Sequence, residues 1–184
     1  MNARKLILDA AFECLETTPI DQIKVADIVE ASGVSRPTFY RLYSDKYEMV
    51  KDLYSERILT YYVNVSTPAE MNRAIYDNLV FFKENPNVTR NMFFSKDSFA
   101  LKAHFRNVTC EYNALFWKNL GTDVDDERVM GALRLWSFGI MSFLLEWFKA
   151  GMPGDPQLIA DQFSLAVPVG VVQGSSVEGA YDFR

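Results

Sequence analysis

The fold of this chain is decided by residues 25–46, which read VADIVEASGVSRPTFYRLYSDK. Apolar residues recur at helical spacing on both sides of a short turn that contains Gly33, a residue suited to backbone conformations that others resist. Ser35 can cap the second helix, and Pro37 falls in its first turn, where a missing N–H costs nothing. Two short helices joined in this way are typical of a helix-turn-helix, pinned together by Ile28, Val34 and Phe39.

The segments around this stretch also have helical periodicity, and none alternates convincingly as a strand would. We therefore expect an all-α protein with about nine helices, in which a three-helix head precedes a helical body. The fourth helix should start after a Ser44 cap, and Asp97 or Ser98 should cap a long helix in the body. A break near residues 63–68 predicts a head over 1–62 and a body over 63–168, followed by a flexible tail over 169–184.

Composition is that of an ordinary globular protein, with 49% hydrophobic and 23% charged residues. The formal charge is −5, and residues 1–60 contain eight Lys and Arg against ten Asp and Glu. Bulk charge therefore does not argue for a nucleic-acid partner. Residues 33–46 do carry a local charge of 3 − 1 = +2, from Arg36, Arg41 and Lys46 against Asp45.

Other sequence signals narrow the function class. Cys14 and Cys110 lie far apart, so we expect two buried apolar residues and not a disulfide. No signal peptide opens the chain and no apolar run looks long enough to span a membrane, which predicts a cytoplasmic protein. We find no motif of a nucleophile, phosphate loop or metal site, and His104 is the only histidine, so an enzyme is not expected.

From Ile7 to Val50 the sequence resembles the TetR family of transcriptional regulators. The resemblance rests on ILDAA in the first helix, then DIVEASGVS, then TFYRLY, and then Lys46 at the start of the fourth helix, all in order and register. It implies a homodimer that binds a pseudo-palindromic operator in double-stranded DNA. It further implies a repressor that a small-molecule effector releases.

The resemblance also implies roles for individual residues. Arg36 would reach a base edge and Pro37 a thymine methyl group or sugar, whereas Thr38, Tyr40 and Lys46 would bond phosphates. The amino end of the fourth helix would add backbone N–H groups for a phosphate. The full set of expected DNA-binding residues is Lys24, Ser35, Arg36, Pro37, Thr38, Tyr40, Arg41 and Lys46.

Two positions depart from the family pattern. Where the family usually has Thr or Ser as a cap of the second helix, this chain has Lys24 followed by Val25, so the cap is expected to be lost. Leu42 replaces a residue that commonly adds a phosphate contact. An activator, or an interaction module with reduced DNA binding, is therefore the alternative function.

The helix expected over residues 128–150 has two apolar stripes, one bulky and one of mainly small residues. A helix that is apolar on so much of its surface should be buried on two sides. Family resemblance implies a dimer interface made by this helix and the one near 156–167. Its expected residues are Ala132, Leu135, Gly139, Ser142, Leu158 and Gln162, and the alternative is a helix packed only within its own chain.

Aromatic residues of the body are candidates for an effector pocket. The expected lining residues are Phe82, Phe94, Phe105, Tyr112, Phe116 and Trp136, although the same residues could form a solid core. No cofactor or metal is expected, because the acidic residues at 123–127 suit the start of a helix. The segment from Leu135 to Pro156 faintly resembles regulators grouped with dihydroxyacetone-kinase control.

Overall fold

The computed structural model describes residues 2–94 and 99–173, and in this part of the chain it contains helices and no strand. The expected all-α class is therefore confirmed. Asp97 and Ser98, the expected caps of the long helix, lie outside the described residues. The elements are α1 (Ala3–Thr17), α2 (Val25–Ser32), α3 (Arg36–Leu42), α4 (Lys46–Arg57), a 3-10 helix η1 (Leu59–Tyr62), α5 (Pro68–Glu84), α6 (Pro86–Phe93), α7 (Phe99–Asn119), α8 (Glu127–Lys149), α9 (Pro156–Leu165) and α10 (Val169–Val172).

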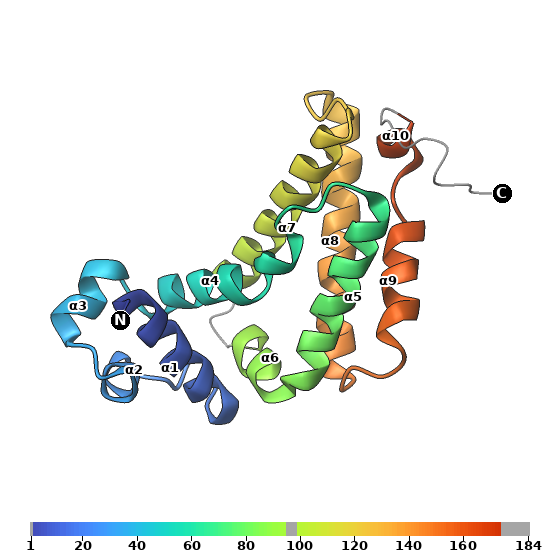
Figure 1. The fold of residues 1–184 in the computed structure, drawn as a ribbon. Helices are drawn as coiled ribbons and strands as arrows, with labels where there is room; N and C mark the ends of the chain where they lie inside the picture. Colours follow the sequence, from blue (N-terminus) through green and yellow to red (C-terminus); the bar gives the residue numbers. More distant parts are fainter. Residues whose placement is uncertain (1, 95–98, 174–184) are drawn as a thin grey trace. The chain divides into compact units, whose positions relative to one another are not determined.

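The chain divides into two compact units, whose helices are labelled in Figure 1. The head unit lies within Met1–Thr60 and Glu84–Phe105, and the body unit within Tyr61–Lys83 and Arg106–Arg184. The chain therefore passes between the units three times. Helix α7 contributes residues to both of them.

The helix-turn-helix forms as the sequence predicts. Helix α2 ends at Gly33, which adopts the left-handed conformation with φ 66°, and a side chain resists that conformation. The Ser35 hydroxyl accepts the Thr38 backbone N–H at 3.3 Å, and Pro37 lies in the first turn of α3. Phe39 is fully buried beneath α3, and Ile28 is fully buried beneath α2. The turn and the core together fix the angle between the two helices.

The head unit also includes α6 and the first part of α7, which differs from the expected division after residue 62. The Asn91 side chain donates to the Leu15 carbonyl at 2.8 Å, and the Ile20 backbone N–H donates to the Asn91 carbonyl at 3.1 Å. Phe105 stacks on Tyr54 at 4.3 Å between ring centroids. The chain returns to the head unit after α5, so neither unit is continuous in the sequence.

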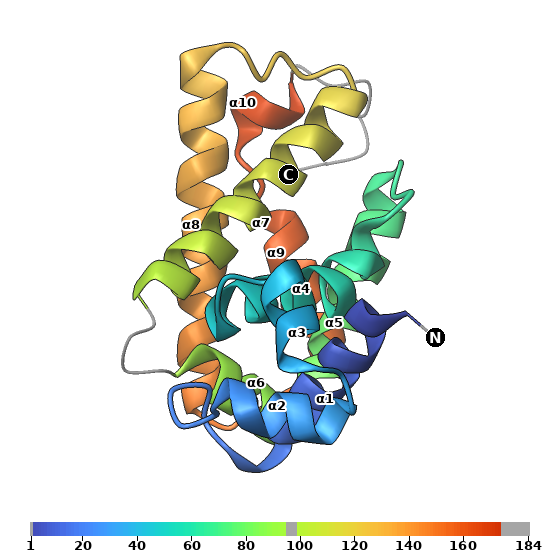
Figure 2. The same ribbon diagram turned by 90° about the vertical axis from the view of Figure 1, so that its left-hand side faces the viewer.

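The body unit is built from α5, α8 and α9, which run alongside one another in Figure 1, together with the rest of α7 and α10. Phe82 of α5 packs on Phe148 of α8 at 4.8 Å, and Phe143 of α8 packs on Phe163 of α9 at 5.3 Å. Figure 2 shows α10 beside one end of α8. Residues 169–172, which the sequence placed in a flexible tail, form helix α10. Val171 of this helix is buried, and its carbonyl accepts the Thr122 hydroxyl.

Helix α8 corrects one expectation about membranes. It spans 23 residues, and an 18-residue window within it has a mean hydropathy of 1.3, which is enough to cross a bilayer by length and composition alone. Only 22% of that window is buried. The expectation that no apolar run is long enough was therefore wrong. Length and composition alone do not distinguish a membrane span from an apolar helix that packs against protein.

Candidate nucleic-acid interface

One face of α3 is exposed. Arg36, Pro37, Tyr40 and Arg41 are all exposed, and Thr38 is half-buried. The Thr38 hydroxyl lies 2.9 Å from the Ser35 hydroxyl, so the two side chains share a local hydrogen bond. Five of the expected DNA-binding residues and their Ser35 cap therefore lie on one short helix whose opposite face is anchored by Phe39.

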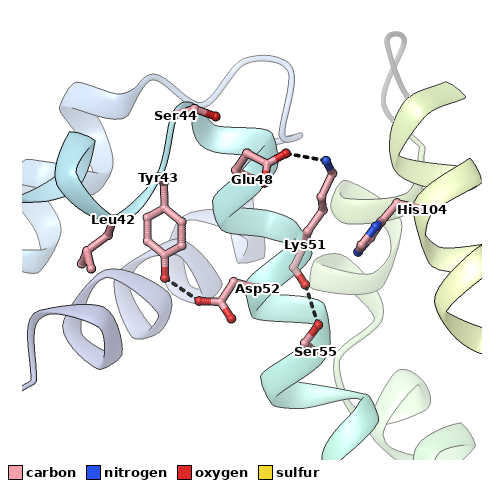
Figure 3. Close-up of a pocket in the computed structure, with 8 residues that line it drawn as sticks. All are labelled: Leu42, Tyr43, Ser44, Glu48, Lys51, Asp52, Ser55 and His104. Carbon is pink, nitrogen blue, oxygen red and sulfur yellow. Dashed lines mark hydrogen bonds and ion pairs between the residues drawn. The ribbon is translucent and has the colours of Figure 1, made fainter. Parts of the chain in front are cut away.

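A partly buried carboxylate connects the end of α3 to α1 and α4. Asp52 of α4 accepts two hydrogen bonds from the Arg4 guanidinium of α1, at 2.8 and 2.6 Å. Its Oδ2 also accepts the Tyr43 hydroxyl at 2.7 Å, directly after α3 (Figure 3). Burial alone would raise the pKa of Asp52, but the hydrogen bonds from Arg4 and Tyr43 outweigh it and lower that pKa. Burial and the Asp52 hydrogen bond raise the pKa of Tyr43.

Sequence reasoning missed this network. Tyr43 is buried, and its hydroxyl has a polar partner in Asp52. Arg4 and Asp52 lie 48 residues apart, so no local spacing pairs them. The only available signal was that a buried tyrosine hydroxyl needs a hydrogen-bond partner.

Beside this network lies a polar pocket of about 540 Å³. Figure 3 shows its wall on α4, where Lys51 pairs with Glu48 at 2.5 Å, and His104 of α7 facing that wall. His104 is half-buried on α7. The lining residues are Leu42, Tyr43, Ser44, Glu48, Lys51, Asp52, Ser55 and His104.

Lys46 has a structural role in addition to the expected phosphate contact. Its Nζ donates to the carbonyl oxygens of Asp21 and Ile23, at 2.7 and 2.8 Å. These carbonyls belong to the segment just before α2, so Lys46 ties the start of α4 to the start of α2. An ammonium group has three donors, which leaves one for a phosphate.

The amino end of α4 is less open to a phosphate than expected. Asp45, and not Ser44, is the cap, and its carboxylate accepts the backbone N–H groups of Tyr47 and Glu48 at 2.8 and 2.9 Å. A carboxylate here occupies the donors that would otherwise receive an anion. At α2, Lys24 provides no side-chain cap, as expected, but the Asp27 carboxylate accepts the Lys24 backbone N–H at 2.8 Å.

The expected effector-pocket residues are divided between the two units. Phe94 and Phe105 belong to the head unit, where Phe105 is fully buried between Tyr54 and Phe93. Tyr112 and Phe116 line a pocket of about 160 Å³ in the body unit. Phe82 and Trp136 also belong to the body unit but do not line that pocket. Among the described residues, no group of three or more potential metal ligands comes together.

The fold and this surface define a helix-turn-helix DNA-binding protein with a helical carboxyl-terminal body. The family model described as bacterial regulatory proteins of the TetR family matches residues 7–53, and the model described as a transcriptional regulator C-terminal region matches residues 69–167. The chain belongs to the TetR family of transcriptional regulators. A comparison with curated proteins gives no significant match. The likeness to dihydroxyacetone-kinase regulators stays a prediction.

Solved structures of TetR regulators share the fold. A TetR-family regulator from Streptomyces coelicolor matches with a TM-score of 0.66 and 17% identity, covering 99% of this chain and 85% of the other. A TetR regulator from a Rhodococcus species matches with a TM-score of 0.63 and 16% identity, covering 88% and 93%. The repressor AlkX from a Dietzia species matches with a TM-score of 0.54 and 15% identity, covering 89% and 92%.

The Asp52 network predicts an acid-dependent stability. Because the pKa of Asp52 is lowered in the folded chain, its contribution is fully present above the ordinary carboxyl pKa of 3.8 and is lost as the pH falls through the lowered value. Asp52→Asn should reduce the free energy of unfolding by about 1–2 kcal/mol at neutral pH, since Arg4 is partly exposed. The difference from wild type should shrink below about pH 4. Urea denaturation across pH measures this, and exposed Asp125→Asn is the control. A difference that stays constant down to pH 2 would contradict the network.

The two lysines of the interface should behave differently. Lys46→Met removes two charge-assisted hydrogen bonds to backbone carbonyls, so it should cost about 1–3 kcal/mol of stability as well as DNA affinity. Lys24→Met, at an exposed position, should lower DNA affinity and leave stability within about 0.5 kcal/mol. Thermal unfolding and DNA titration of both variants measure the two effects. Equal losses of stability in the Lys46→Met and Lys24→Met variants would contradict a structural role for Lys46.

Proposed function

We propose that this chain is a homodimeric repressor that binds a pseudo-palindromic operator and is released by a small-molecule effector. The proposal that this chain reads DNA rests on Arg36, which is exposed on the first turn of α3, whereas Phe39 of the same helix is fully buried. An arginine presented in this way can pair bidentately with a guanine in the major groove. Such a regulator acts in the cytoplasm and needs no catalytic activity.

The exposed apolar surface of α8 and α9 supports the dimer. Leu135 is 76% exposed and Leu158 is 58% exposed, and Gly139, one turn after Leu135, presents no side chain. Of the remaining expected interface residues, Ser142 and Gln162 are exposed and Ala132 is half-buried. Leucines this exposed favour burial against a second subunit. To read two half-sites, a twofold dimer needs its two α3 helices about one turn of DNA apart.

The small pocket of the body unit is our candidate effector site. It is lined by Tyr62, Val63, Asn64, Val65, Met71, Tyr112, Leu115 and Phe116. A volume of about 160 Å³ resembles that of an apolar cavity of roughly 150 Å³ that holds benzene. The effector would therefore present a single ring or short chain with a polar group for Tyr112 or Asn64. Release requires that the effector favour a spacing of the two heads that does not fit the operator.

The base-reading role of Arg36 predicts a specific loss. Arg36→Ala should cost about 1–3 kcal/mol in binding the preferred operator and should relax the preference at one base pair. Titration of the DNA upstream of its own gene, with single base substitutions, measures both effects. An Arg36→Ala variant that keeps the wild-type order of affinities across the substituted duplexes would exclude the base contact. Binding that does not weaken with salt would favour the interaction module instead.

The dimer predicts a response to charge on α8. Leu135→Glu places a carboxylate in the proposed interface but at an exposed position of the single chain, so it should give monomers without unfolding them. Leu115→Glu is the matched control, because Leu115 is 56% exposed on α7, outside the proposed interface. Sedimentation of both variants gives the oligomeric state. Dissociation by both changes, or by neither, would contradict an interface on α8.

The effector site predicts binding of small ring or chain alcohols. Benzyl alcohol, phenol and 1-hexanol should raise the melting temperature of the protein and weaken its DNA binding. Val63→Trp, at an exposed residue of the pocket lining, should abolish both effects by blocking the pocket. Val169→Trp, also exposed but on α10, is the control and should respond as wild type does. Alcohol effects that persist in Val63→Trp would place the effector elsewhere.

A further inference from the structure

We infer that Tyr40 is a positioning residue that holds the Arg36 guanidinium ready for a base, and that its ring, not its hydroxyl, does this. The inference rests on the proposed base-reading role of Arg36. It departs from the phosphate contact that family resemblance implies for Tyr40.

The two side chains already meet in the protein without DNA. The Arg36 Cζ lies 5.6 Å from the centroid of the Tyr40 ring, one turn further along α3. A guanidinium within about 6 Å of an aromatic ring is attracted by the negative face of that ring. Arg36 is therefore held by a partner on its own helix even though both residues are exposed.

The Tyr40 ring is itself fixed by the core. It meets the Phe39 ring edge-on, with centroids 5.5 Å apart and an interplanar angle of 84°. Phe39 is fully buried, so it provides a rigid base for the neighbouring ring. A line of contacts thus runs from the core through Phe39 and Tyr40 to the exposed cation. An arginine held in this way loses less conformational freedom when it binds a base.

Stacking and base pairing use different parts of the guanidinium. The flat face contacts the ring, while the N–H groups that pair with the guanine O6 and N7 point outward in the plane. Arg36 can therefore keep its contact with Tyr40 while it reads a base. The Tyr40 hydroxyl takes no part in the stack, so the ring and the hydroxyl can be tested separately.

The test compares Tyr40→Phe with Tyr40→Leu on two duplexes that differ at the base pair whose preference Arg36→Ala relaxes. Tyr40→Phe keeps the ring and should retain the wild-type ratio of affinities. Tyr40→Leu should reduce that ratio about two- to fivefold, the range expected for loss of an exposed cation–ring contact. In an Arg36→Ala background, Tyr40→Leu should change the ratio no further.

Two outcomes would overturn the inference while leaving Arg36 as the base reader. In the first, Tyr40→Phe and Tyr40→Leu weaken both duplexes equally, which indicates a phosphate contact through the hydroxyl. In the second, Tyr40→Leu leaves the ratio unchanged. If Arg36→Ala relaxes no base preference, the proposed function itself fails at this residue and the positioning role falls with it. Tyr40→Leu should lower the free energy of unfolding by no more than about 1.5 kcal/mol, the contribution of one aromatic pair, and Tyr40→Phe should unfold as wild type does.

Discussion

The carboxylate of Asp52 is the constraint on which the geometry of the head unit depends. It joins α1 through Arg4, the end of α3 through Tyr43, and α4 through its own backbone. Arg4 balances its charge, so the carboxylate remains ionised although it is partly buried. Because Tyr43 directly follows α3, the network fixes where that helix ends, while Ser35 and Gly33 fix where it begins.

A second set of contacts fixes the start of α2 against the start of α4. Lys46 makes them by donating to two backbone carbonyls ahead of α2, while Asp45 caps α4. Lys46 keeps its positive charge and one remaining donor. The Asp45 carboxylate occupies backbone N–H groups at the start of α4 that could otherwise bind an anion.

Features that act within one helical turn could be predicted from the sequence. The left-handed Gly33, the Ser35 cap and the buried Phe39 were all found in this way. Contacts between residues far apart in the sequence could not be predicted in this way. The residues around a carboxylate such as Asp52 form the same sequence pattern whether the carboxylate is paired or solvated. The aromatic residues expected to line an effector pocket show the same limit. Periodicity identified Phe105 as apolar, but not that it packs with Tyr54 in the head unit.

We propose that α3, held in place by these contacts, reads DNA from a twofold dimer. Selection of bound duplexes from a random DNA pool by the full chain can decide this. We expect an enriched motif of two inverted half-sites with centres about one helical turn apart, each containing a guanine whose enrichment depends on Arg36. A pool that shows no motif after selection, or a motif without inverted symmetry, would contradict it.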